Sequence, residues 1–143
     1  MDYGSLLPGQ TVSERSYHLD PSTVETYLRA IGEAPPTDSS DNERQGQVAP
    51  PMSVAALGLR GVIQDLKIPE GTLHTAQEVE FRRAIDVGTL LHCQATLSQN
   101  SVRGGRRFIV VNLEVEDTNH NIVLTGKSTL VMPLQLLSKK EQR

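Results

Sequence analysis

The sequence has 143 residues, of which 37% are apolar and 22% charged, and its formal net charge at pH 7 is −3. These values predict one soluble globular domain over 1–137 with a frayed tail at 138–143, and they argue against disorder and bulk nucleic-acid binding. No apolar run approaches the ~20 residues that span a bilayer, and the N-terminus lacks a secretory signal, so we expect a cytoplasmic location. The single cysteine, Cys93, excludes an internal disulfide.

The first part of the chain predicts a strand, an amphipathic helix and a polar loop. Loose alternation favours a short strand over 11–19. Asp20 and Pro21 predict a helix start, with the aspartate as N-cap and the proline in the first helical position. The apolar stripe of this helix consists of Val24, Tyr27, Leu28 and Ile31. Residues 37–47 are polar without periodicity, which is typical of a surface loop that is either a connector or a lid.

Residues 53–66 predict a second, buried helix. Ser53 is a possible N-cap, and apolar or small residues occupy nearly every face of the helix. Gly58 and Gly61 each cost ~1 kcal/mol relative to alanine inside a helix. We therefore expect another backbone to approach this helix closely, as when a sheet wraps around it.

From Leu73 onward the apolar period changes to two, which predicts an antiparallel meander. The strands are expected at 73–81, 90–99, 107–117 and 122–132. A turn is expected over 100–105. The residues expected to face inward are Leu91, Cys93, Ala95, Leu97, Ile109, Val111, Leu113, Val115, Ile122, Leu124 and Leu130. Together these elements predict an α+β fold in which a curved antiparallel sheet surrounds one long central helix.

Four stretches of the sequence are similar to motifs of one known family. VAPPMS at 48–53 resembles a V-A-P-x-T-F start of the central helix, and LHTAQEVEF at 73–81 resembles H-x-x-Q-x-F-x-F/Y. RRAIDVGTLL at 82–91 resembles H-R-P-I-x-x-G-D-x-L, and 107–131 resembles the closing hairpin. On these motifs the chain resembles the MaoC-like dehydratases, which have the hot-dog fold. It is most similar to the non-catalytic, N-terminal-type half of (R)-specific 3-hydroxyacyl-thioester dehydratases.

The sequence departs from this family at its catalytic signature. Active members carry D-x-N-P-x-H after the first helix, and this motif supplies an Asp–His pair. The corresponding residues 32–40 read GEAPPTDSS, and no aspartate in the chain precedes a histidine at that spacing. Alanine also replaces the usual proline at Ala84, and Thr89 replaces an acid. Because hydration of an enoyl thioester needs a base for water and an acid for the α-carbon, the resemblance implies that a partner supplies the pair.

Two residues of the predicted strand 73–81 are weak catalytic candidates. His74 and Glu78 fall on the same face by simple alternation, but a histidine acting as acid–base needs an orienting carboxylate. A surface or interface histidine is the alternative. His18, His92 and His120 are less promising, and no cluster has the spacing of metal ligands, so we expect no metal. Cys93 lies on an apolar strand face and is expected to be an inert core thiol.

Two further sets of residues are candidates for binding a thioester. Arginine forks suit the phosphates of coenzyme A or phosphopantetheine, with solvated turns as the alternative. These arginines are Arg82 and Arg83 at one turn, and Arg103 and Arg106 at another. Apolar residues at the start of the central helix are candidates for an acyl channel, with plain core as the alternative. They are Pro50, Pro51, Met52, Val54 and Leu57.

The sequence leaves three functions open. The resemblance implies a subunit of an enoyl-CoA hydratase or 3-hydroxyacyl-thioester dehydratase that binds an acyl-CoA or acyl-carrier thioester without a cofactor. A non-enzymatic acyl-CoA binding module is the second possibility. The third is a hot-dog thioesterase in which Glu78 or Glu80 activates water. Because an isolated curved sheet leaves edges exposed, we expect a homodimer, or a heterodimer with another hot-dog subunit.

Overall fold

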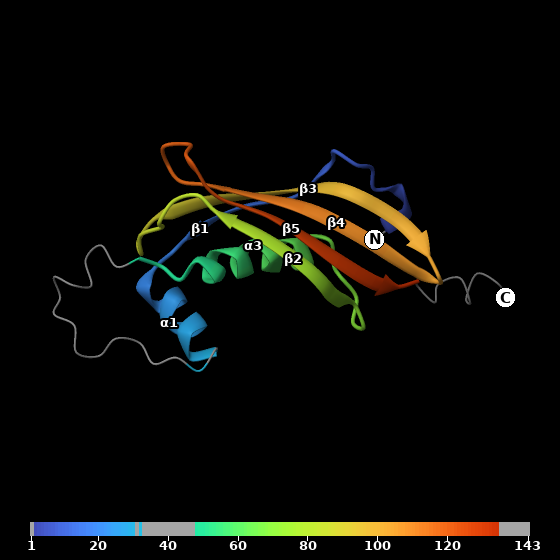
Figure 1. The fold of residues 1–143 in the computed structure, drawn as a ribbon, viewed down its shortest axis with the longest axis horizontal. Helices are drawn as coiled ribbons and strands as arrows, with labels where there is room; N and C mark the ends of the chain where they lie inside the picture. The colour runs from blue at the N-terminus through green and yellow to red at the C-terminus, as the bar shows by residue number, and fades with distance from the viewer. Residues whose placement is uncertain (1, 31, 33–47, 135–143) are drawn as a thin grey trace.

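The computed structural model describes residues 2–30, 32 and 48–134 (Figure 1). A short 3-10 turn precedes the first strand, and the elements that follow are one strand, two helices and four further strands. Their bounds are Tyr3–Ser5, β1 Thr11–His18, α1 Pro21–Ala30, α3 Pro51–Asp65, β2 Leu73–Phe81, β3 Leu90–Arg103, β4 Arg106–Glu116 and β5 Ile122–Pro133. The predicted loop 37–47 and the predicted tail lie outside the described residues.

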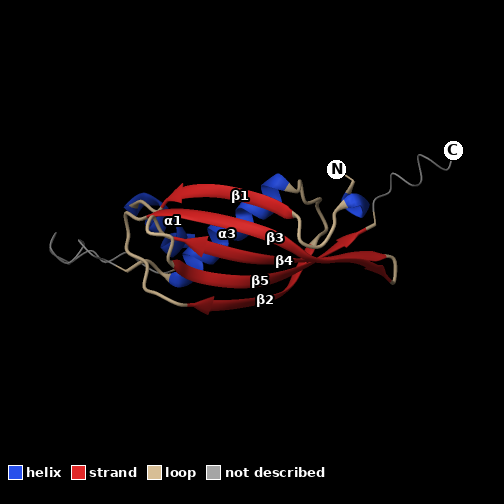
Figure 2. Ribbon diagram, turned by 90° about the horizontal axis from the view of Figure 1, so that it is seen from above, coloured by secondary structure: helices blue, strands red, loops and turns tan. Residues whose placement is uncertain are grey.

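The five strands form one antiparallel sheet in the order β1-β3-β4-β5-β2 (Figure 2). The sheet curves over α3, which packs most closely against β1, and α1 lies beyond α3 on the same side (Figure 1). The predicted α+β architecture, a curved sheet around one long helix, is therefore confirmed. β1 and β2 are the two edge strands, so each has one side without a neighbouring strand in the part of the chain that the structure describes.

The first residues of α1 are held by Asp20, as predicted. Its carboxylate accepts the backbone N–H of Thr23 at 2.8 Å and the hydroxyl groups of Ser22 and Thr23 at 2.8 and 2.9 Å. These hydrogen bonds, that of the Thr23 backbone first, lower the pKa of Asp20 from 3.8 to about 2. Pro21 then begins the helix with a backbone already suited to it.

The depressed pKa of Asp20 predicts a specific acid sensitivity. A carboxyl whose pKa is lowered by folding stabilises the native state above pH 3.8, and this stabilisation is lost as the pH falls towards about 2. We expect Asp20→Asn to remove this pH dependence, because asparagine caps a helix without titrating. The measurement is urea unfolding of both proteins between pH 5 and pH 2, written as a difference in unfolding free energy. A difference that stays constant over this range would contradict the assignment.

The start of α3 differs from the prediction. The helix begins at Pro51, with Pro50 as N-cap and no side-chain cap. Ser53 lies inside the first turn, where its hydroxyl donates to the Pro50 carbonyl at 2.6 Å. The prediction of Ser53 as N-cap is therefore wrong. The physical reason is that a proline in the first helical position has a helical φ and no N–H group to satisfy, so the helix starts without a capping side chain.

The two glycines of α3 allow the helix to lie close to the sheet. A Cβ atom on Gly58 would lie 2.5 Å from a methyl carbon of Leu113, and one on Gly61 would lie 2.7 Å from the Tyr17 hydroxyl. The glycines do allow close packing, but side chains of β4 and β1 fill the space, so the predicted approach of another backbone is not observed at these positions. The described residues leave part of the opposite face of α3 uncovered, since Met52 and Ile63 are each 41% exposed. Burial of the helix on all faces is therefore not observed in the single chain.

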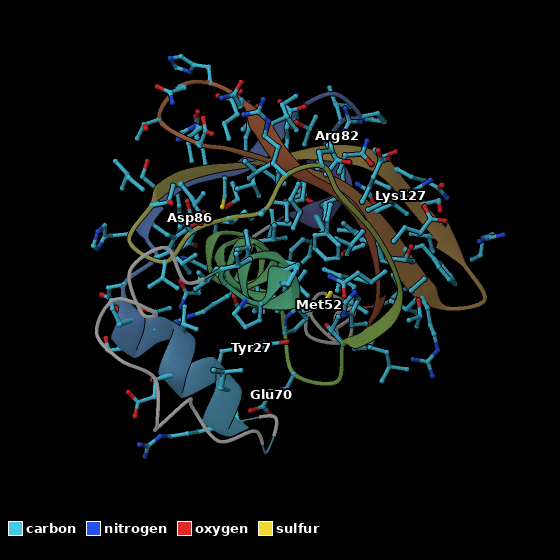
Figure 3. The ribbon with its side chains drawn as sticks, turned by 60° about the vertical axis from the view of Figure 1, so that its left-hand side comes forward. Tyr27, Met52, Glu70, Arg82, Asp86 and Lys127 are labelled. Atoms are coloured by element: carbon cyan, nitrogen blue, oxygen red, sulfur yellow. The ribbon has the colours of Figure 1, made fainter. Side chains whose placement is uncertain are left out.

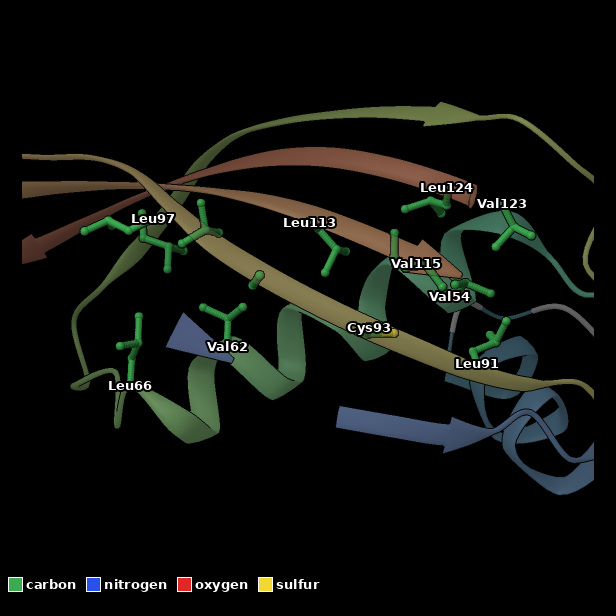
Figure 4. Close-up of a cluster of buried hydrophobic side chains, with 14 of the residues drawn as sticks. Val54, Val62, Leu66, Leu91, Cys93, Leu97, Leu113, Val115, Val123 and Leu124 are labelled. Carbon is green, nitrogen blue, oxygen red and sulfur yellow. The ribbon is translucent and has the colours of Figure 1, made fainter. Parts of the chain in front are cut away.

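The core lies between α3 and the concave face of the sheet (Figure 4). The predicted inward residues of β3 and β4 are buried, among them Leu91, Ile109 and Val115, each at 0% exposure. β3 extends to Arg103, so the turn is only Gly104-Gly105, with φ of +59° and +74°. The predicted turn over 100–105 is too long, because 100–103 pair with the start of β4. β2 differs from the other strands, since it is exposed throughout except for half-buried Val79.

Candidate functional site

A groove of about 350 Å³ lies between α1 and α3. Its walls come from helices that are separated in the chain by the segment leading from 32 to 48. The α1 wall consists of Ser22, Thr23, Thr26, Tyr27 and Ala30, and the α3 wall consists of Ser53, Ala56, Leu57 and Arg60. The two walls together give an apolar strip bordered by hydroxyl groups and one guanidinium.

Most of the hydroxyl groups in this groove are already engaged. Thr26 donates to the Ser22 carbonyl at 2.9 Å, and Ser53 is bonded to Pro50. Among the described residues, the Tyr27 phenol and the Arg60 guanidinium have no side-chain hydrogen bond to another residue. A ligand in the groove therefore meets apolar surface and two available polar groups.

The predicted acyl-channel residues divide into two groups. Leu57 lines the groove, and Pro50, Pro51 and Met52 lie at the start of α3 beside it, with Met52 41% exposed. Figure 3 shows Tyr27 on α1 below the end of α3 that carries Met52. Val54 is fully buried in the core and does not line the groove, so the plain-core alternative holds for that residue.

The predicted phosphate-binding arginines lie at opposite ends of the sheet. Arg82 and Arg83 follow β2, and both backbone N–H groups point to the Val123 carbonyl near the start of β5. Arg106 pairs with Pro133 at the far end of β5, directly beside Arg103. At ~3.3 Å per strand residue the two ends are roughly 33 Å apart, so the two arginine pairs cannot bind the same phosphate.

Only the first arginine pair lies at the end of the sheet where α3 begins. Val48 forms a bridge with Asp86, and the Ala49 N–H donates to the Ile85 carbonyl at 2.7 Å. These contacts join the segment after β2 to the residues that enter α3. Figure 3 views this end, with Arg82, Asp86 and Met52 labelled.

His74 and Glu78 do not lie on the same face of β2. The register shifts between His74 and Ala76, so His74 pairs with the buried Leu130 while Glu78 pairs with Lys127. Paired residues share a face, which places His74 on the side of α3 and Glu78 on the convex side. The predicted alternation is wrong here because the bulge adds one residue. Both side chains are exposed, and they cannot act together within one chain.

Residues 7–126 match the family model described as "FAS1-like, dehydratase domain region". The chain belongs to this family of dehydratase domains. No curated protein matches the sequence. The expected relationship to the MaoC-like dehydratases is thereby confirmed at the level of the family.

Solved structures share the fold of this dehydratase-family chain. The (R)-hydratase PhaJ1 of Pseudomonas aeruginosa has a TM-score of 0.74 at 18% identity, covering 93% of this chain and 86% of that one. The HadBC 3R-hydroxyacyl-ACP dehydratase complex of Mycobacterium tuberculosis gives 0.70 at 16%, covering 87% and 96%. A hot-dog-like protein of Thermanaerovibrio acidaminovorans gives 0.62 at 19%, covering 99% and 96%. The predicted hot-dog fold is confirmed by these similarities.

Other titratable groups of this dehydratase domain lie away from the groove. Cys93 is buried in the core, and burial raises the pKa of its thiol to about 12, as expected of an inert cysteine. His92 lies on the outward face of β3, where Glu14 is 2.8 Å and Ser16 3.3 Å from its ring nitrogens. The described residues contain no group of three or more potential ligands that could hold a metal. None of the described helices has the length and apolar character needed to cross a bilayer.

Sequence reasoning missed the groove and its two available polar groups. The helical spacing predicts Tyr27 only as part of the apolar stripe of the first helix and assigns no role to Arg60. A signal for Arg60 was present in the sequence. Ser53, Leu57 and Arg60 follow the i, i+4, i+7 spacing of one helix face, and an arginine there interrupts an otherwise apolar helix.

Proposed function

We propose that this chain is the acyl-thioester-binding subunit of an enoyl-CoA hydratase or 3-hydroxyacyl-thioester dehydratase, and that a second hot-dog subunit supplies the Asp–His pair. The observation that carries the proposal is a dehydratase-family fold with a groove, in a sequence that lacks D-x-N-P-x-H. In hydration, the partner's base takes a proton from water, the water oxygen bonds to the β-carbon, and an acid returns a proton to the α-carbon. This chain then binds and orients the thioester.

The arrangement of the groove supports this division of labour. The acyl chain would lie along Leu57 between α1 and α3, after entering beside Met52. The phosphates of the carrier would reach Arg82 and Arg83, which lie at the same end of the sheet as the start of α3. Guanidinium groups suit phosphates because they donate two parallel hydrogen bonds.

The uncovered surfaces of the chain support a hot-dog partner. β2 is an edge strand that is exposed on both faces, with Leu73 and Phe81 58% and 43% exposed. The outer face of α3 also leaves Met52 and Ile63 in solvent. A second subunit that added a strand beside β2 and covered α3 would bury both of these surfaces. The structurally similar HadBC protein is described as a complex.

The test of this proposal is binding together with activity of the purified chain. We expect calorimetry to detect binding of octanoyl-CoA, while an enoyl-CoA hydration assay of the chain alone stays at the level of the buffer. Robust hydration by the chain alone, retained after further purification, would contradict the missing-pair argument. Failure to bind any acyl thioester would contradict the binding role.

A non-enzymatic acyl-CoA binding module is the second candidate, because the same groove exists without an acid–base pair. It would be favoured if the chain binds acyl-CoA and no catalytic hot-dog subunit associates with it. No observation favours the thioesterase alternative. Glu78 and Glu80 line a hollow on the convex side of the sheet, with Asn112 and Lys127, and α3 lies on the other side.

The two arginine pairs lie at opposite ends of the sheet, so substitutions in one pair can be compared with the same substitutions in the other. We expect R82Q/R83Q to weaken binding of octanoyl-CoA by about tenfold, because two charge-assisted phosphate contacts are lost. Octanoyl-pantetheine, which lacks phosphate, should bind the variant and the native protein equally. R103Q/R106Q is the control, since it removes the same charge at the far end of the sheet. Equal weakening by the two double variants, measured by calorimetry, would show that the loss reflects overall charge.

A further inference from the structure

Arg60 lies in the wall of the α1–α3 groove, and no acidic residue in the described part of the chain pairs with it. Among residues 2–30, 32 and 48–134 its guanidinium forms no ion pair and donates no side-chain hydrogen bond. Asp65, an acid on the same helix, is already occupied. Its carboxylate accepts the Ser13 hydroxyl at 2.6 Å and two nitrogens of Arg15 at 3.1 and 2.5 Å.

The groove places Arg60 at a defined distance from the start of α3. Ser53, Leu57 and Arg60 share one face of the helix, and at ~1.5 Å per residue Arg60 lies roughly 10 Å along the axis from Ser53. Ala56 and Leu57 make the wall between them apolar, and Tyr27 faces them from α1. An acyl chain that enters beside Met52 would therefore run along apolar surface and end near a cation.

The cation at the Arg60 end of the groove discriminates between acyl chains with different terminal groups. A plain alkyl chain that filled the groove would remove water from Arg60 and offer no hydrogen bond in return, which is unfavourable for a charged group. A carboxylate at the end of the chain would accept two parallel hydrogen bonds from the guanidinium, and the Tyr27 hydroxyl is a further donor.

We propose that Arg60 selects acyl thioesters whose chain ends in a carboxylate, that is, thioesters of medium-length dicarboxylic acids. The inference rests on the proposed function, because it assumes that the acyl chain occupies the groove between α1 and α3. Tyr27 lines the opposite wall of the same groove.

The test is calorimetric binding of suberoyl-CoA and octanoyl-CoA, whose acyl chains are equally long, to the full chain. We expect the native protein to bind suberoyl-CoA about tenfold more tightly, since a hydrogen bond to a charged group contributes on that scale. Arg60→Met should abolish the preference, and Arg60→Lys should keep part of it. Arg29→Met is the control, because Arg29 is an exposed arginine of α1 that pairs with Glu25 outside the groove. It should keep the full preference.

The possible results distinguish failure of the proposed role of Arg60 from failure of the proposed thioester-binding function. Equal binding of the two thioesters by the native protein would overturn the role of Arg60 and leave the thioester-binding role intact. Binding of neither would overturn the proposed function itself. Repeating the comparison with pantetheine thioesters identifies the anion that Arg60 binds. Arg60→Met could weaken the binding of octanoyl-CoA as much as that of suberoyl-CoA and leave the binding of both pantetheine thioesters unchanged. In that case Arg60 contacts a carrier phosphate and the inference is wrong. Thermal unfolding of each variant checks that the fold is kept.

Discussion

Replacing Ile63 with lysine is expected to weaken association with the hot-dog partner by roughly a hundredfold while leaving this chain folded. Ile63 is 41% exposed on the face of α3 that points away from the sheet, so the single chain tolerates a charge there. At an interface the same lysine would be buried without a counter-charge, which is strongly unfavourable. The measurement is the mass of the assembly by light scattering across a concentration series.

Leu7→Lys provides the matched control for this prediction. Leu7 is 67% exposed in the segment before β1, outside the surface formed by β2 and the outer face of α3. Leu7→Lys should leave the mass of the assembly unchanged. If Ile63→Lys also leaves the mass unchanged, the outer face of α3 is not part of the interface. Circular dichroism and thermal unfolding of both variants distinguish loss of assembly from loss of folding.

Replacing Gly58 with leucine is expected to lower the free energy of unfolding by roughly 2–3 kcal/mol. Even a single Cβ at this position would lie 2.5 Å from one methyl carbon of Leu113 and 2.9 Å from the other. The longer side chain must displace Leu113 or lift α3 from the sheet. The gain in helix propensity, ~1 kcal/mol relative to glycine, does not offset this overpacking.

A double-mutant cycle tests whether the loss arises from contact with Leu113. We expect Gly58→Leu combined with Leu113→Ala to be more stable than the sum of the two single changes predicts, because the new side chain fills the space left in β4. Urea unfolding of the four proteins gives the coupling free energy. Strict additivity would mean that Gly58 and Leu113 do not share this space and that α3 lies further from the sheet.

The fold could be predicted from the sequence where one pattern decided the outcome. Apolar residues at every second position predicted that Leu91, Ile109 and Val115 lie on the concave face, and all three are buried. Asp20 before Pro21 marked the start of α1. The aspartate accepts a backbone N–H group of the first turn, and the proline has a helical φ and no N–H group to satisfy. The two glycines of α3 indicated close packing, since glycine in a helix interior is unfavourable unless the space is needed.

The errors arose where pairing with a distant segment overrides the local pattern. The register shift after His74 reverses the faces of β2, and nothing in 73–81 alone marks it. Residues 100–103 have turn-like composition but are held in β3 by the start of β4. The groove could not be predicted either, because Tyr27 and Arg60 belong to helices separated along the chain and line one groove only in the folded protein.

In the proposed function this chain binds an acyl thioester but depends on a second hot-dog subunit for its acid–base pair. The decisive experiment is an enoyl-CoA hydration assay on the native chain, first alone and then with a hot-dog subunit that carries D-x-N-P-x-H. We expect no hydration by the chain alone, turnover by the complex, and loss of turnover when the aspartate of the partner's motif is replaced by alanine. Turnover that persists in the complex with that altered partner would contradict it.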